Sequence, residues 1–281
     1  MNRKTYTWQC RDKTLLLGER TLIMGILNAT PDSFSDGGQY YSLDKALEHS
    51  LEMIDDGADI IDIGGESTRP GAIKVSLEDE LNRTIPLIKE LRKRSDVAIS
   101  IDTTKASVAR EALLAGANII NDVSGFQLDP NMAQMAQELE AGCAIMHMRG
   151  TPDNMQKKCD YSDLVEEVKA ELQASVDSLL SMGLKQNQLV IDPGIGFSKT
   201  AEQNISLMKN LYQFSSMDYP ILLGTSRKSF IGHILDESDA KERVWGTAAS
   251  LCVGIQQGAH IMRVHDVKEM AQVCKVYDIC S

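Results

Sequence analysis

The chain has 281 residues, of which 43% are hydrophobic and 25% are charged, and its formal net charge is −11. This composition is typical of a globular protein and excludes intrinsic disorder, a collagen-like repeat and a disulfide scaffold. The acidic excess argues against a general binder of nucleic acid or membrane surfaces, although a local cluster of cations can still hold a small anion.

The cysteines and the amino-terminal segment indicate the compartment. The six cysteines form no C-x-x-C pair and match no zinc-binding spacing, so we expect reduced thiols. The first residues are polar and lack the apolar stretch of a signal peptide, and no apolar run reaches membrane-spanning length. We therefore expect a cytoplasmic protein with no membrane partner.

Short apolar runs rich in Val and Ile alternate with longer amphipathic stretches. Strands are predicted at 22–27, 60–63, 98–101, 119–121, 144–146, 189–191, 221–223 and 261–264. Helices are predicted at 43–56, 76–94, 105–115, 130–140, 163–180, 200–211, 244–257 and 267–276. Several helices end at Gly-Ala or Gly-Leu, where glycine can adopt the left-handed conformation that stops a helix.

Eight such units without a break in composition predict one α/β domain over residues 1–281, a closed (β/α)8 TIM barrel with a short N-terminal extension. A doubly wound open sheet is the alternative, because it produces a similar pattern. Residues 1–20 are expected to form a small lid of strands under the barrel.

Polar residues follow each of the eight predicted strands, at the edge where the active sites of TIM barrels lie. An aspartate after a strand is often a helix cap, so Asp102 or Asp192 alone is explained equally well by capping. Enrichment at all eight strand ends favours a binding site instead.

Two groups of these residues suit particular ligands. Arg69, Arg263 and His265, together with Lys228, are cations expected to converge at the mouth, where they would suit a phosphate or diphosphate. The alternative for Arg263 and His265 is a local salt bridge with the acidic residues that follow them. Ser229 begins the stretch after Lys228, and a helix starting there would favour an anion such as a carboxylate.

The second group is suited to a flat heterocycle. Asp102, Asn121 and Asp192 are expected deep in the cup, where carboxylates and amides can pair with the N–H edge of a ring. The segment 194–199, G-I-G-F-S-K, begins like a dinucleotide fingerprint but ends in Lys, so that motif fails. No histidine pair has metal-ligand spacing, whereas Mg²⁺ needs few protein ligands beside substrate phosphates, and Asn28 is the natural candidate to ligate it.

Taken together, the strand-end motifs resemble those of the dihydropteroate synthase family of bacterial folate biosynthesis. They occur in family order: GILNATPDSFSDGG (25–38), DIGGESTRPGA (62–72), SIDTTK (100–105), IINDVSG (119–125), MHMRGTP (146–152), VIDPGIGF (190–197), GTSRKSFIG (224–232) and MRVHDV (262–267). The resemblance covers the chain from about residue 22 to 267 and implies a pterin-binding TIM barrel.

The resemblance also implies roles for individual residues. The pterin ring would be held by Asp102, Asn121, Asp192 and Lys228. The anion would be contacted by Thr68, Arg69, Arg263 and His265, and Mg²⁺, the one cofactor implied, would be ligated by Asn28. The 4-aminobenzoate would be framed by Phe34, Pro70, Lys228 and Ser229. Those expected to act in catalysis are Lys228, Asp192, Arg263 and His265.

The implied reaction condenses (7,8-dihydropterin-6-yl)methyl diphosphate with 4-aminobenzoate and releases 7,8-dihydropteroate and diphosphate. Because the nucleophile is a weak aromatic amine, we expect a dissociative displacement in which cations stabilise the departing diphosphate. The loops at 29–41 and 66–75 are rich in Gly, Ser, Asp and Pro and are expected to order when ligands bind.

Rival functions are a pterin-dependent methyltransferase and a non-catalytic pterin-binding paralogue. Neither needs the complete set of TSRKS, RVHD and STRPG segments that this chain has. The family further implies a homodimer, for which apolar helix faces near 244–276 are the expected interface, and competition by sulfonamides with 4-aminobenzoate.

Overall fold

The computed structural model describes residues 3–29, 38–67 and 74–281, and its centre is a barrel of eight parallel strands. The barrel strands are β3 (Leu22–Asn28), β4 (Ile60–Gly64), β5 (Ala98–Asp102), β6 (Ile119–Asp122), β7 (Gly142–Met146), β8 (Leu189–Asp192), β9 (Leu222–Leu223) and β10 (Ile261–Val264). Their order in the sheet is β8-β7-β6-β5-β4-β3-β10-β9. The barrel closes where Ile191 donates its N–H to Pro220 O at 3.0 Å. The predicted TIM barrel is confirmed, and the open sheet is excluded.

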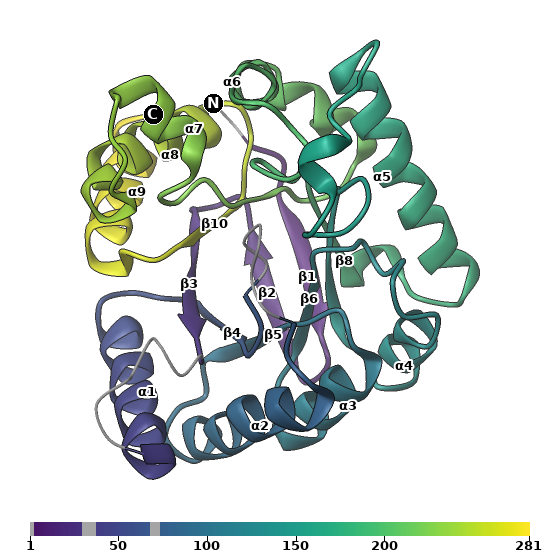
Figure 1. Cartoon of the computed structure of the whole chain (residues 1–281), viewed down its shortest axis with the longest axis vertical. Coiled ribbons are helices and arrows are strands. Elements are labelled where there is room, and N and C mark those ends of the chain that lie inside the picture. The colour runs from purple at the N-terminus through teal and green to yellow at the C-terminus, as the bar shows by residue number, and fades with distance from the viewer. Residues whose placement is uncertain (1–2, 30–37, 68–73) are drawn as a thin grey trace.

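Helices surround the strands (Figure 1). They are α1 (Gly38–Asp55), α2 (Leu77–Arg94), α3 (Ala106–Ala115), α4 (Met132–Glu138), α5 (Leu164–Ser181), α6 (Ala201–Lys209), α7 (Ser229–Leu235), α8 (Val244–Gln256) and α9 (Val267–Cys280). The Ser76 side chain caps α2 by accepting from Asp79 N at 3.1 Å. Gly116, with φ of 118°, ends α3 in the left-handed conformation expected from the sequence.

Alternation along each strand divides the barrel into an outer and an inner core. Outward residues such as Ile61, Ile63 and Ile99 pack under the helices in one large apolar cluster. Inward residues at the amino-terminal ends form a second apolar cluster, which includes Ile60 and Ile119. Towards the carboxyl ends of the strands the inward positions become polar. The amino-terminal half of the barrel interior is therefore an apolar core that stabilises the fold, and the carboxyl-terminal half offers polar groups that can bind a ligand.

An antiparallel hairpin of β1 (Tyr6–Cys10) and β2 (Lys13–Leu17) covers the lower end of the barrel. Trp8 and Leu17 are fully buried and join the inner apolar cluster. Trp8 also donates its indole N–H to Gln188 O at 2.9 Å. The predicted lid of strands is therefore confirmed.

Some element boundaries differ from the prediction. The helix expected at 130–140 is shorter because Asp129 O accepts from Met132 N and forms a turn before α4 begins. The last helix continues past residue 276 to Cys280. Helix α7 has only seven residues, too few to show a periodic pattern, and only its start at Ser229 was foreseen. Within the described ranges, none of the helices is long and apolar enough to cross a membrane.

Candidate active site at the carboxyl ends of the strands

Inward-facing polar residues lie at the carboxyl end of the barrel. Along its own strand, each comes two or four residues after an apolar residue of the inner cluster. Asp62 follows Ile60 on β4, Asn121 follows Ile119 on β6, and the same step places Asp192 on β8 and Arg263 on β10; Asp102 lies four residues after Ala98 on β5. Strand periodicity thus brings together residues more than 200 positions apart in sequence.

Arg263 is the centre of this cluster. Its Nε donates to Asp62 Oδ2 and its Nη2 donates to Asp102 Oδ2, each at 2.6 Å. The acidic residue that follows it, Asp266, pairs instead with Arg227, whose Nε lies 3.0 Å from Asp266 Oδ2. The alternative of a local salt bridge for Arg263 is therefore wrong, because the side chain points into the barrel while Asp266 lies at the start of α9.

The Asp62 carboxylate accepts hydrogen bonds from two predicted site residues, Arg263 and Asn121. Besides the bond from Arg263, its Oδ2 accepts from Asn121 Nδ2 at 3.0 Å. Asp62 is fully buried, and its Oδ1 makes no hydrogen bond within the described part of the chain. Sequence reasoning missed this residue because it lies within the strand rather than after its end.

The pKa of the Asp102 carboxyl is raised above its usual value. Burial raises the pKa of its carboxyl to about 7, while the positive charge of Arg263 opposes the rise. A carboxyl group that titrates near neutral pH can accept a hydrogen bond when ionised and donate one when protonated. This property suits recognition of the nitrogen-rich edge of a heterocycle.

Asp192 and Lys228 form the second half of the cluster. Burial raises the pKa of Asp192, whose Oδ1 accepts from Gly194 N at 2.8 Å. Desolvation lowers the pKa of Lys228 to about 8, although attraction to Asp192 partly compensates. The Lys228 ammonium donates to Ile195 O and lies 4.7 Å from the centroid of the Phe197 ring.

Apolar side chains lie beside these polar groups at the mouth. Val123, Met146, Met148 and Met155 form a small cluster, and Phe197 packs against it. A few convergent polar groups next to an apolar wall are the usual composition of a site for a flat organic ligand.

His265 and Asn28 line one cavity of about 440 Å³ between β3, α1 and the start of α9. The backbone N–H of His265 donates to Ser226 Oγ at 3.1 Å, and its Nδ1 lies 3.0 Å from the same oxygen. Arg263 is turned toward the carboxylates inside the barrel, so the expected cations are divided between the barrel and this cavity. Ser229 begins α7 directly after Lys228, as predicted.

Several predicted contacts fall outside the described residues. These are Phe34 in one loop and Thr68, Arg69 and Pro70 in the other. Within the described ranges no group of three or more His, Cys, Asp or Glu side chains is arranged to hold a metal ion.

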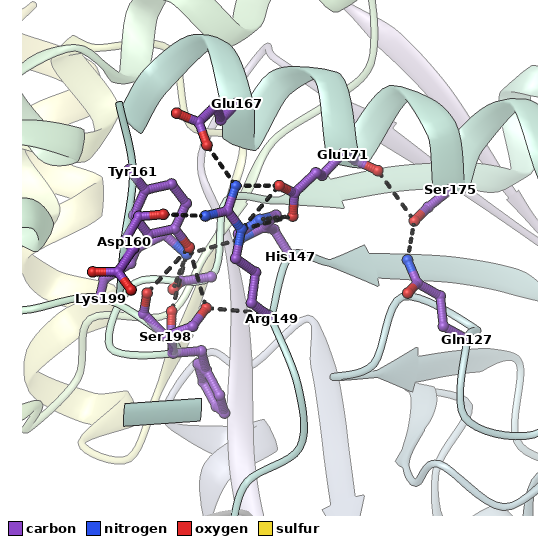
Figure 2. Close-up of polar contacts among 12 residues, drawn as sticks. Gln127, His147, Arg149, Asp160, Tyr161, Glu167, Glu171, Ser175, Ser198 and Lys199 are labelled. Carbon is purple, nitrogen blue, oxygen red and sulfur yellow. Dashed lines mark hydrogen bonds and ion pairs between the residues drawn. The ribbon is translucent and has the colours of Figure 1, made fainter. Parts of the chain in front are cut away.

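A polar network beside the site was also missed from the sequence (Figure 2). It joins His147 and Arg149, which follow β7, to Glu171 on α5 and to Lys199 after β8. His147 and Arg149 stand among the strand-end residues, and Lys199 is the residue that breaks the dinucleotide pattern. Their positions after strands could have indicated His147, Arg149 and Lys199 as members of a site. Nothing in the sequence distinguishes Glu171 from other helical glutamates.

Comparison with known proteins places this geometry in a family. A sequence profile of the family described as pterin binding enzyme matches residues 24–265. The dihydropteroate synthase of Synechocystis sp. is 54% identical over 261 residues, which cover 93% of this chain and 90% of the relative. The chain belongs to the pterin-binding enzyme family, and the resemblance to its dihydropteroate synthases is confirmed.

Solved structures agree with this placement. Dihydropteroate synthase from Xanthomonas albilineans with 4-aminobenzoic acid has a TM-score of 0.92 and 36% identity, with 99% of this chain and 98% of that chain covered. The enzyme from Burkholderia cenocepacia complexed with 7,8-dihydropteroate has a TM-score of 0.88 and 39% identity, with 98% and 96% covered. These findings favour the synthase over the pterin-dependent methyltransferase and the non-catalytic paralogue.

Proposed function

We propose that this chain is a transferase that condenses (7,8-dihydropterin-6-yl)methyl diphosphate with 4-aminobenzoate to give 7,8-dihydropteroate and diphosphate. The observation that carries the proposal is the convergence of Asp102, Asn121, Asp192 and Lys228 at the barrel mouth of a chain related to dihydropteroate synthases over nearly its whole length.

The pterin ring binds among these four residues. Asp192 and Asp102 offer carboxylate oxygens, and Asn121 offers both a donor and an acceptor to the ring edge. Desolvation at the barrel mouth strengthens each of these hydrogen bonds relative to water. The small apolar cluster with Phe197 provides the wall against which the ring lies.

The reaction is a dissociative displacement. The C–O bond to the diphosphate breaks as the methylene carbon gains positive charge, and Asp192, aided by Asp102, stabilises that charge. The amine nitrogen of 4-aminobenzoate then forms the new C–N bond and releases a proton. Lys228, Arg263 and His265 stabilise the negative charge of the departing diphosphate.

The bonds of Arg263 to Asp62 and Asp102 leave capacity for an anion. They use Nε and one N–H of Nη2, whereas a guanidinium has five N–H donors. Arg263 can thus keep its anchorage in the barrel while it donates to the diphosphate. The segments 30–37 and 68–73 carry the other predicted contacts of the anion and of 4-aminobenzoate, with Ser229 next to the carboxylate of the latter.

Mg²⁺ fits this account as a companion of the diphosphate. Asn28 would hold it through an amide oxygen, a ligand type that Mg²⁺ accepts, at the cavity that His265 also lines. Since the described residues include no preformed cluster of metal ligands, most of its coordination would come from the diphosphate and water. When bound, Mg²⁺ would neutralise part of the charge on the leaving group.

We also propose that two copies of the chain form a homodimer. Trp245 and Val253 are exposed on one face of α8, two turns apart, and Val276 and Ile279 are exposed on α9. Helices α7, α8 and α9 group on one side of the barrel (Figure 1). Exposed aromatic and aliphatic side chains in one region favour association with a second copy.

Asp192→Asn tests the pterin site. The variant should fold and bind pterin diphosphate roughly 10- to 100-fold more weakly by calorimetry, since hydrogen bonds to charged groups contribute about 1.5–3 kcal/mol. Asp122→Asn is the matched control, because Asp122 is also a buried carboxylate at a strand end but bonds to Ser124. Equal pterin affinity in wild type and Asp192→Asn would remove Asp192 from the site.

A further inference from the structure

A buried lysine lies under the loop that follows β8. Lys199 is 3% exposed, and its Nζ has three acceptors: His147 Nδ1 at 2.9 Å, Gly194 O at 3.1 Å and Phe197 O at 3.0 Å. An ammonium has three N–H donors, so these contacts satisfy it completely. Two of the acceptors, Gly194 O and Phe197 O, lie at opposite ends of one turn. The ammonium therefore bridges the two ends of the 194–197 turn.

His147 and Glu171 hold this lysine in place (Figure 2). His147 is buried, and its Nε2 lies 3.0 Å from Glu171 Oε2. A proton on Nε2 is the one that Glu171 can accept, which leaves Nδ1 free to accept from Lys199. Burial lowers the pKa of His147 to about 4, in agreement with a neutral ring. Glu171 is fixed in turn by Arg149, whose Nε lies 2.9 Å from Glu171 Oε1.

The opposite side of the same loop contacts the pterin-site residues. Gly194 N donates to Asp192 Oδ1 at 2.8 Å, Ile195 O accepts from Lys228, and the Phe197 ring lies beside the Lys228 ammonium. Residues 193–198 therefore separate the buried cation from the site. Any shift of this loop is passed directly to Asp192 and Lys228.

Two glycines show how tightly the loop is packed. A Cβ at Gly194 would lie 2.0 Å from His147 O, and a Cβ at Gly196 would lie 2.9 Å from Lys228 Cδ. The loop thus contacts the His147 backbone on one side and the Lys228 side chain on the other. Little space remains for it to move without moving both.

We propose that Lys199, held by His147 and Glu171, is a positioning residue for the pterin site, and that it orients Asp192 and Lys228 through the 193–198 loop. This inference rests on the proposed function. Burying an ammonium has a desolvation cost, which is offset here because all three of its donors are hydrogen-bonded. The lowered pKa of Lys199, about 7 because of burial, reflects that cost.

Lys199→Met tests this role, because methionine has a similar length and lacks the donors. Pterin diphosphate binding, measured by calorimetry without 4-aminobenzoate, should weaken by about tenfold. Because the variant leaves three buried acceptors without a donor, it should also unfold at a lower temperature than wild type, so binding is compared at a temperature at which circular dichroism shows both proteins folded. Lys209→Met, an exposed lysine on the following helix, is the control and should bind as wild type does. Should Lys199→Met not fold, Lys199→Gln replaces it under the same criteria.

The double variant Lys199→Met, Asp192→Asn distinguishes positioning from an independent contribution. If Lys199 acts through Asp192, the two losses of affinity do not multiply, and the double variant binds no more than about threefold more weakly than Asp192→Asn alone. Unchanged pterin affinity in Lys199→Met, or losses that multiply fully, would overturn the inference. Absence of pterin binding by the wild type would instead contradict the proposed function.

Discussion

Charged residues of opposite sign lie close together at the barrel mouth before any ligand arrives. Arg263 lies between Asp62 and Asp102, and Lys228 lies next to Asp192. Buried charges are tolerated when they are paired and hydrogen-bonded, so this arrangement keeps the mouth stable. It also means that a ligand with both an N–H edge and an anionic group can satisfy acids and cations together.

The Glu171 carboxylate should make stability depend on acid. Its hydrogen bond from His147, reinforced by Arg149, lowers its pKa from 4.5 to about 2. Because the folded-state value is the lower one, the stabilisation is present above about pH 4.5 and is lost as the pH falls toward 2. The side chain is 39% exposed, so solvent screening limits the contribution to about 1 kcal/mol.

Urea unfolding of wild type and Glu171→Gln over a pH series measures this effect. The variant should be less stable by about 1 kcal/mol at pH 7, and the difference should shrink below pH 4.5. A difference that stays constant from pH 7 to the lowest pH at which the protein folds would show that the carboxylate charge does not stabilise the network.

Among the elements, the amino-terminal hairpin has a structural role that is separate from the site. Trp8→Ala should lower the free energy of unfolding by about 3–5 kcal/mol, because it leaves a cavity under the barrel. Leu16→Ala in the same hairpin is the control, since Leu16 is 59% exposed, and it should change stability by no more than about 0.5 kcal/mol. Urea unfolding gives both values, and similar small losses would mean that the hairpin does not seal the barrel.

The sequence was most informative for the repeated elements. Strands such as β3 and β7 are nearly continuous apolar runs because both faces are buried, and that pattern is visible without a structure. Helix α7 escaped clear prediction because its seven residues give no period, whereas the two-residue strand β9 lies within the strand predicted at 221–223. Element boundaries shifted where local turns, such as the one at Asp129, competed with the helix.

Site residues were predicted where a polar side chain follows a predicted strand. They were missed where their role depends on contacts with residues far away in the sequence. Asp102, Asn121 and Asp192 are directly readable in this way. Asp62 and Lys199 act through partners that the fold supplies, Arg263 and His147, and no local pattern specifies those pairs. Resemblance to a family assigned roles to matching motifs, but the contacts of Lys199 required the structure.

The whole molecule is an acidic barrel that presents cations at one end and an apolar helical face at its side. Trp245, 78% exposed on α8, is the residue whose change should most affect association. Trp245→Glu places a charge in the proposed interface and should convert a dimer to a monomer in sedimentation velocity runs. Leu16→Glu, at the exposed surface of the hairpin, should leave the dimer intact. A wild-type protein that is monomeric at tens of micromolar would contradict the proposed dimer.

Turnover is the most direct test of the proposed activity. Purified protein with (7,8-dihydropterin-6-yl)methyl diphosphate and Mg²⁺ is assayed for diphosphate release, with and without 4-aminobenzoate. We expect release that depends on 4-aminobenzoate and is matched mole for mole by 7,8-dihydropteroate. Tight pterin binding without such release, or release without the condensed product, would contradict the assignment of this barrel as a synthase.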